Sequence, residues 1–160
     1  MTIRIETVYD KRPEGYDRLG SYAGGSNMKE MKLPFYSPTL MKVNDNSNGE
    51  RKKVMTWPML YSTPGSEPPK IENLPEPTIG RVNIIEVSSI VVAVQRFEMP
   101  ATEVVARGLT RNLLNDIKRD KLVPAASALG GECIVGQFDA LFSLNKRRNE
   151  VWVELESHLW

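Results

Sequence analysis

Only one cysteine and one histidine are available for nucleophilic or metal chemistry in this 160-residue sequence. Cys133 and His158 together cannot fill a structural zinc site, which takes about four nitrogen or sulfur ligands. A single cysteine also excludes an internal disulfide. A Ser-His-Asp triad would have to use His158, which we interpret as part of the C-terminal tail beside Leu159 and Trp160. These residues argue against hydrolase and metalloenzyme chemistry.

Motifs for covalent or nucleotide chemistry are also missing from the sequence. We find no phosphate loop, dinucleotide glycine fingerprint or serine elbow. We interpret Gly24-Gly25 as a helix end and Gly130-Gly131 as a strand entry. Glu154 and Glu156 lie two residues apart on one predicted strand, and we interpret them as part of a solvated strand face. The sequence therefore predicts a protein that is not an enzyme.

The most unusual composition is methionine mixed with aromatic residues. Five of the seven methionines fall between residues 28 and 59. The mixed residues are Met28, Met31, Phe35, Tyr36, Met41, Met55, Trp57, Met59 and Tyr61. Flexible thioethers beside flat rings suit a large, planar, apolar ligand, and they suit a small core equally. The pattern alone favours the core.

Charge and hydropathy exclude further classes. The 21 Lys and Arg residues balance 20 Asp and Glu residues, so the net charge of +1 argues against nucleic-acid binding. Three basic clusters, at 51–53, 118–121 and 146–148, are typical of solvated turns and helix ends, although an arginine there has the fork that binds a ligand carboxylate. The aliphatic run 90–94 falls far short of the roughly 20 residues that span a bilayer. Residues 1–10 lack a signal-peptide core. Removal of a transit peptide before residue 1 stays an open alternative.

Periodicity predicts two similar halves joined by a proline-rich linker, in which six of the eleven prolines lie between Pro58 and Pro77. Helices are expected from Pro13 to Gly24-Gly25 and from Pro100 to Leu122. The apolar face of the second helix is expected at Val105, Leu109, Leu113 and Ile117. Strands are expected at Thr2–Val8, Met31–Val43, Lys52–Ser62, Val82–Val87, Ile90–Phe97, Glu132–Leu144 and Asn149–Glu156. The order is β-α-β-β, linker, β(β)-α-β-β, within a single domain of residues 1–160.

Several of these segments resemble the SOUL family of haem-binding proteins. The stretch 147–152 is similar to the family's C-terminal "RRNEVW" signature, and Tyr22 to Asn27 is similar to its helix-ending "Y-x-G-x-N" segment. Pro68-Pro69 and Phe138-Asp139 resemble its double-proline linker and its "Y-D-x-P" run, and Lys32–Val43 stands at its "M-T-x-P-V" strand. The matches keep their order across about residues 13 to 155.

The resemblance implies an α+β fold: a twisted antiparallel β-barrel of two β-α-β-β halves with two flanking helices. It also implies a non-catalytic protein that binds haem or another tetrapyrrole in an apolar pocket near the first helix. Family members occur in the cytoplasm and, in photosynthetic eukaryotes, in plastids. We expect Arg18 and Lys32 to contact ligand carboxylates, and the apolar lining to be Met28, Met31, Phe35, Trp57 and Met59.

The sequence also departs from the family. Phe35-Tyr36 replaces the usual Met-Thr pair, and Gly20-Ser21 replaces larger side chains on the first helix. No histidine lies near that helix, so we expect packing and propionate contacts to hold the ligand without a histidine on the iron. The first family strand has no counterpart here, which predicts an open barrel edge.

A second function stays open beside tetrapyrrole binding. A degraded pocket, an open edge and the apolar tail at 159–160 are also typical of a docking subunit in a larger assembly, such as a photosynthetic pigment-protein complex. In that case a protein partner would bind at the open edge or at the C-terminal tail.

Overall fold

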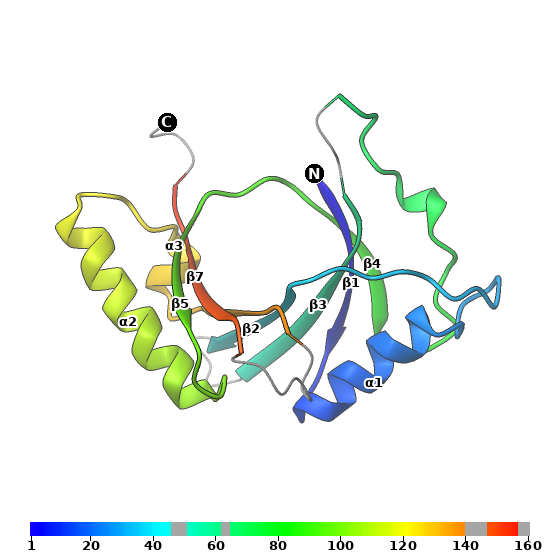
Figure 1. Cartoon of the computed structure of the whole chain (residues 1–160), viewed down its shortest axis with the longest axis horizontal. Coiled ribbons are helices and arrows are strands. Elements are labelled where there is room, and N and C mark those ends of the chain that lie inside the picture. The colour runs from blue at the N-terminus through cyan, green and yellow to red at the C-terminus, as the bar shows by residue number, and fades with distance from the viewer. Residues whose placement is uncertain (46–50, 62–64, 140–146, 157–160) are drawn as a thin grey trace. The chain divides into compact units, whose positions relative to one another are not determined.

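The strands of the chain form one antiparallel sheet. The computed structural model describes residues 1–45, 51–61, 65–139 and 147–156. Seven strands are hydrogen-bonded in the order β4-β1-β3-β2-β6-β7-β5. The order ends on β4 and β5, so the sheet is open (Figure 1). The α+β class with an antiparallel sheet is confirmed, and the sheet is not closed, in line with the predicted open edge.

The elements follow the predicted order. Their bounds are β1 Thr2–Val8, α1 Arg12–Ala23, β2 Thr39–Asp45, β3 Arg51–Tyr61, a 3-10 turn Ile71–Asn73, β4 Val82–Val87, β5 Val92–Phe97, α2 Glu103–Arg119, α3 Ala126–Leu129, β6 Cys133–Gln137 and β7 Asn149–Glu154. The halves are β1-α1-β2-β3 and β5-α2-β6-β7, with β4 between them in sequence. In each half the first strand pairs antiparallel with the last, β1 with β3 and β5 with β7.

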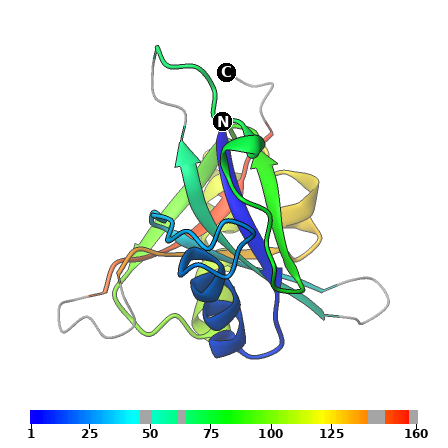
Figure 2. The ribbon, with the colours of Figure 1, turned by 90° about the vertical axis from the view of Figure 1, so that its right-hand side faces the viewer.

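Spatially the chain divides into two compact units. The first unit is Met1–Thr39 with Lys53–Ser89, and the second unit is Leu40–Lys52 with Ile90–Trp160. In the first unit β1 lies between β3 and β4, and its alternate residues Ile3 and Ile5 are fully buried. The helix α1 packs on this sheet through Leu19 and Tyr22, which are also fully buried (Figure 2). The core of this unit is therefore formed by alternate residues of β1 and by residues about one turn apart on α1.

The second unit has its own core. Strand β7 pairs with β5 on one side and β6 on the other, and Val151 and Val153 of β7 are buried. Helix α2 packs on these strands through Leu113 and Ile117. No helix of the described residues is long and apolar enough to cross a membrane.

Three expectations about elements were wrong in part. The strand expected at Met31–Val43 begins only at Thr39, because Pro34 and Pro38 lack the N–H that a ladder needs and the backbone between them bonds elsewhere. Helix α2 begins at Glu103, where the hydroxyl of Thr102 accepts from the Val105 N–H at 3.3 Å. Its buried face is Ala106, Thr110, Leu113 and Ile117, so Val105 and Leu109 lie at the margin of the contact.

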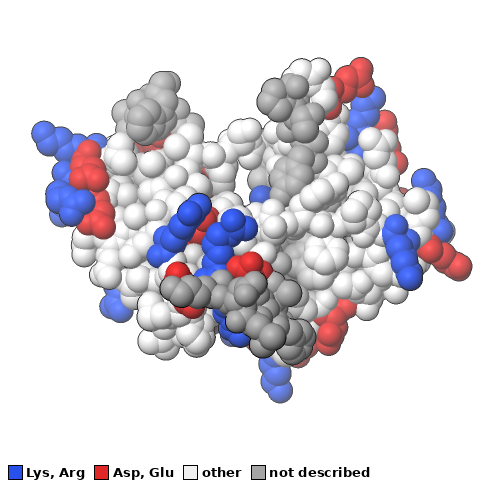
Figure 3. All heavy atoms as spheres, viewed as in Figure 1, with Lys and Arg blue, Asp and Glu red and all other residues white. Residues whose placement is uncertain are grey.

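Other predictions fall partly outside the described residues. Strand β6 ends at Gln137, and the remainder of the strand predicted to Leu144 is not described beyond Asp139. The C-terminal residues His158 to Trp160 are likewise outside the described part. On the face shown in Figure 3, basic and acidic side chains are interspersed, as the balanced composition predicts.

Candidate functional site

Four of the seven predicted site residues lie in the segment of residues 24–38, which connects α1 to β2. Met28, Met31 and Phe35 are exposed by 69%, 48% and 55% of their surface, and Lys32 is also exposed. Large apolar side chains that stay in water at one place mark a surface where a ligand or partner binds. The segment belongs to the first unit, as do Arg18, Trp57 and Met59.

The buried side chain of Asn27 fixes the first part of this segment. Its amide group donates to the carbonyls of Tyr22 at 3.1 Å and Met31 at 2.7 Å, and its oxygen accepts from the N–H groups of Lys29 and Met31, both at 3.2 Å. The hydroxyl of Tyr22 donates to the carbonyl of Pro75 at 2.7 Å. The tyrosine and asparagine of the "Y-x-G-x-N" resemblance are therefore scaffold residues that shape the loop.

Two backbone hydrogen bonds hold the later part of the segment against the unit. The N–H of Leu33 donates to the carbonyl of Ala23 at 2.8 Å, and the N–H of Tyr36 donates to the carbonyl of Pro58 in β3 at 2.9 Å. Phe35 lies between these two anchors. Its ring is consequently placed beside the middle of β3.

Phe35 stacks on Trp57, and this pair is the centre of the candidate site. The ring centroids lie 4.4 Å apart with planes inclined by 22°. Trp57 is only 6% exposed because its strand alternates and directs it, with Met55 and Met59, toward the core. The indole Nε1 of Trp57 is buried and has no hydrogen-bond partner in the described part of the chain.

Helix α1 also lies close to Trp57. The ring of Tyr16 lies 6.1 Å from the indole, tilted by 53°. Burial raises the pKa of Tyr16, and the charge of Arg12 and a hydrogen bond with Thr39 offset part of that rise. A Cβ at Gly20 would lie 3.8 Å from the indole Cη2, which is an ordinary contact distance, so there is room for a methyl group beside the six-membered ring. Tyr16 was missed by sequence reasoning, although its spacing of four from Gly20 places both on one helix face.

The two predicted carboxylate contacts differ in availability. Arg18 already donates to the carbonyl of Val8 and lies 3.7 Å from the carboxylate of Glu14. Lys32 is exposed and makes no ion pair with a described residue. Of the two, Lys32 has the free charge that a ligand carboxylate needs.

The remaining two predicted residues do not join the Phe35–Trp57 pair at the surface. Met59 is 1% exposed and belongs to the core of the first unit. Met28 lines a separate surface pocket of about 360 Å³ with Ile71, Leu74 and Ile84. The methionine and aromatic residues thus divide between core and surface, and both interpretations of the sequence pattern apply to part of the set.

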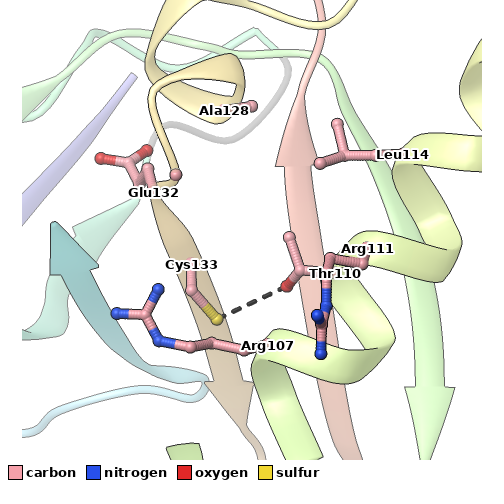
Figure 4. A pocket seen from close by; sticks show the side chains of 8 residues that line it. Arg107, Thr110, Arg111, Leu114, Ala128, Glu132 and Cys133 are labelled. Atoms are coloured by element: carbon pink, nitrogen blue, oxygen red, sulfur yellow. Dashed lines mark hydrogen bonds between the residues drawn. The ribbon is translucent and has the colours of Figure 1, made fainter. Parts of the chain in front are cut away.

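The second unit holds a different pocket, of about 330 Å³, between α2, α3 and β6 (Figure 4). The thiol of Cys133 lies 3.4 Å from the hydroxyl of Thr110 in this pocket. Burial raises the pKa of the thiol, and the Thr110 hydrogen bond and the Arg107 charge offset part of the rise. In the described residues no group of three or more His, Cys, Asp and Glu side chains is placed to hold a metal ion.

The signature at 147–152 leads into β7 and supplies its first four residues in the second unit. The Arg148 N–H donates to the carboxylate of Asp139 at 2.6 Å, and the Arg148 guanidinium lies 4.4 Å from the ring centroid of Phe138. The buried side chain of Asn149 donates to the carbonyl of Met99 at 3.0 Å. The motif "RRNEVW" therefore contacts Phe138-Asp139 through Arg148, and these residues do not line the candidate site.

Comparisons with known proteins connect this geometry with a family. A family model described as SOUL heme-binding protein matches residues 1–154. No curated protein matches the sequence. A solved structure of SAV2435 bound to tetraphenylphosphonium is similar at 11% identity and a TM-score of 0.50, over 98% of this chain and 89% of that chain. A bacterial transcription regulation protein from Staphylococcus aureus is similar at 10% identity and a TM-score of 0.43, over 97% and 92%.

Proposed function

The chain belongs to the SOUL heme-binding protein family, and we propose that it is a non-catalytic protein that binds haem or another tetrapyrrole on its first unit. The observation that carries this site is the Phe35–Trp57 pair, an aromatic stack at the surface beside α1. A tetrapyrrole has a large, flat, apolar face. Aromatic side chains bind such a face well, because they provide a large contact area and lose little conformational entropy on binding.

The residues around the pair fit such a ligand. Gly20 places no side chain beside the Cη2 corner of the indole, and the buried indole N–H has no acceptor in the described residues. Met31 and Lys32 precede Phe35 in the same anchored segment, and they supply an apolar contact and a cation for a propionate. The ligand would supply the pigment chemistry. The chain would supply a stacking surface, a positive charge and shielding of the ligand from water.

Iron coordination has few candidates in the first unit. Its described residues include no histidine or cysteine, and its exposed methionines are Met1, Met28 and Met31. Cys133 lies in the pocket of the second unit, where burial raises the pKa of its thiol. We therefore propose that packing and carboxylate contacts hold the ligand and that the metal contributes little.

Titration of the purified protein tests this proposal. Haem and metal-free protoporphyrin are added separately, and the Soret band and tryptophan emission are followed. We expect saturable binding at micromolar concentrations of both ligands. Their dissociation constants should differ by less than tenfold, which corresponds to about 1.4 kcal/mol of binding free energy. Absence of saturation by either porphyrin would overturn the function, and saturation by haem alone would overturn the metal-independent mode. Tetraphenylphosphonium serves as a comparison ligand that is aromatic but cationic.

A docking role is the alternative, and the edge strand β5 is the observation that favours it. Beside β5 and on it, Ile90, Val91 and Val94 are exposed by 42%, 39% and 44%. An open edge with apolar side chains is a surface on which another chain can add a strand. Size-exclusion chromatography of native extract separates the two roles: a docking subunit elutes in a larger assembly, and a free binding protein elutes at about its own 18.1 kDa.

A further inference from the structure

We infer that Phe35 is a built-in competitor: its ring lies on Trp57 where the flat face of the ligand binds, and the ligand displaces it. This inference rests on the proposed function and adds how the site opens and what the ligand must carry at its edge.

The first argument is the unequal burial of the two rings. Trp57 is 6% exposed and Phe35 is 55% exposed, although they stack face to face at 4.4 Å. Phe35 therefore covers the indole and leaves its own outer surface in water. A flat aromatic ligand that replaced Phe35 would make the same contact with a larger face, so the exchange is favourable.

The second argument is that the exchange needs little backbone movement. The anchors on both sides of Phe35, from Leu33 to Ala23 and from Tyr36 to Pro58, are backbone hydrogen bonds that do not involve the phenyl ring. Rotation of the Phe35 side chain alone uncovers Trp57. Such rotation of an exposed side chain is fast, in the range of picoseconds to nanoseconds.

The third argument is the unpartnered donor. The Trp57 Nε1 is buried without a hydrogen-bond partner in the described residues, and native proteins rarely leave such a donor unpaired. The geometry thus favours a ligand that combines a flat apolar body with an oxygen acceptor at its rim, such as a carboxylate or a ring carbonyl.

Variants at Phe35 test the inference by titration with metal-free protoporphyrin. We expect Phe35→Ala and Phe35→Leu to bind about 2- to 10-fold more tightly than the wild type, because the competing stack is removed. Ile71→Ala is the matched control, since it removes another exposed apolar side chain of the same unit, and its affinity is expected to stay unchanged. Circular dichroism checks that each variant is folded.

Two further readouts follow the indole itself. In 1H–15N spectra the Trp57 Nε1–H signal is identified by its loss in Trp57→Phe, and we expect it to move downfield when porphyrin saturates the protein. Without ligand, Phe35→Ala should make Trp57 more accessible to acrylamide quenching.

The outcomes separate the inference from the function on which it rests. Weaker or unchanged porphyrin binding by both Phe35 variants, with a wild type that binds, overturns the inference and leaves the proposed function standing. Tighter binding by the variants, including binding that only the variants show, supports both. Failure of every protein to bind any tetrapyrrole overturns the proposed function and the inference with it.

Discussion

At the scale of single residues, Trp57 and Tyr22 show two opposite solutions for a polar atom on a buried ring. The Tyr22 hydroxyl donates to the Pro75 carbonyl at 2.7 Å, whereas the Trp57 Nε1 has no partner in the described structure. A buried polar atom without a partner is uncommon in native proteins, and a ligand acceptor is the partner that we propose for the Trp57 donor. Tyr22 is therefore a scaffold residue of the first unit, and Trp57 is the residue of that unit that we propose binds the ligand.

We predict that Tyr22→Phe lowers the free energy of unfolding at pH 7 by roughly 1–3 kcal/mol, because the Pro75 carbonyl loses its donor. Urea unfolding followed by circular dichroism measures this difference. An unchanged urea midpoint would show that the hydrogen bond contributes nothing to stability.

The same tyrosine predicts a pH dependence. Burial raises the pKa of Tyr22 to about 12, above the ordinary value near 10 that applies in the unfolded chain. The neutral form is favoured by folding, so its contribution is complete below pH 10 and is lost as pH rises from 10 to 12. Stability of the wild type should therefore fall in that window more steeply than that of Tyr22→Phe. Burial also raises the pKa of Tyr16, so part of the fall in stability with rising pH is expected in both proteins.

Cys133 gives a prediction about reactivity. Its thiol is 2% exposed and its pKa is raised by burial, and the thiolate is the form that reacts. We expect negligible labelling by a thiol-specific disulfide reagent at pH 8 in the folded protein, and full labelling in urea. Labelling of the folded protein at the rate of a free cysteine would contradict the buried placement.

At the scale of elements, α1 and the segment after it determine the site. The glycines of this region have different roles: a Cβ at Gly20 would find ordinary contact distance, whereas Gly25 has a φ of +122°, which side chains rarely adopt. Gly25 accordingly turns the chain out of the helix into the segment that carries Phe35.

These roles predict opposite effects of alanine. Gly20→Ala should raise the free energy of unfolding by roughly 0.5–1 kcal/mol through helix propensity. Gly25→Ala should lower it by about 1–3 kcal/mol because the backbone conformation is strained for alanine. Thermal and urea unfolding of the pair measure both signs, and a destabilising Gly20→Ala would mean that no room exists beside Trp57.

Local pattern predicted some elements to the residue and failed on others for physical reasons. The strands Thr2–Val8 and Val82–Val87 were predicted with their observed bounds, because alternation is a local property. The segment before Thr39 was wrongly predicted as a strand because its apolar residues serve a loop held by Asn27. The four residues of α3 are too few for a helical period to show.

The candidate site was predicted as a set of residues but without its arrangement. Phe35 and Trp57 were both selected for their aromatic rings, yet their stacking depends on the bond from Tyr36 to Pro58, which joins positions far apart in the sequence. Burial of Met59 and the separate pocket of Met28 also depend on tertiary packing, which spacing alone does not contain.

At the scale of the whole molecule, the same β-α-β-β order occurs twice and serves different ends. The first half carries the aromatic pair Phe35–Trp57, whereas the second half carries the motif at 147–152 and the pocket of Cys133. The family model covers both, so membership of the family does not by itself distinguish scaffold residues from the binding surface that we propose.

This division predicts that a scaffold variant spares binding. Asn149 is 1% exposed and donates to the Met99 carbonyl, so Asn149→Ala should lower the free energy of unfolding by roughly 1–3 kcal/mol. The folded variant should bind porphyrin with wild-type affinity. A loss of affinity in a protein shown to be folded would place the hairpin in the binding site.

The central claim is that a tetrapyrrole binds at Phe35 and Trp57 of the first unit. Its most direct test is residue-resolved 1H–15N spectroscopy of the protein titrated with metal-free protoporphyrin. The account predicts the largest shifts at Gly20, at residues 31–36 and at the Trp57 indole, with small shifts around Cys133. The largest shifts in the second unit, or no shifts at saturating porphyrin, would contradict it.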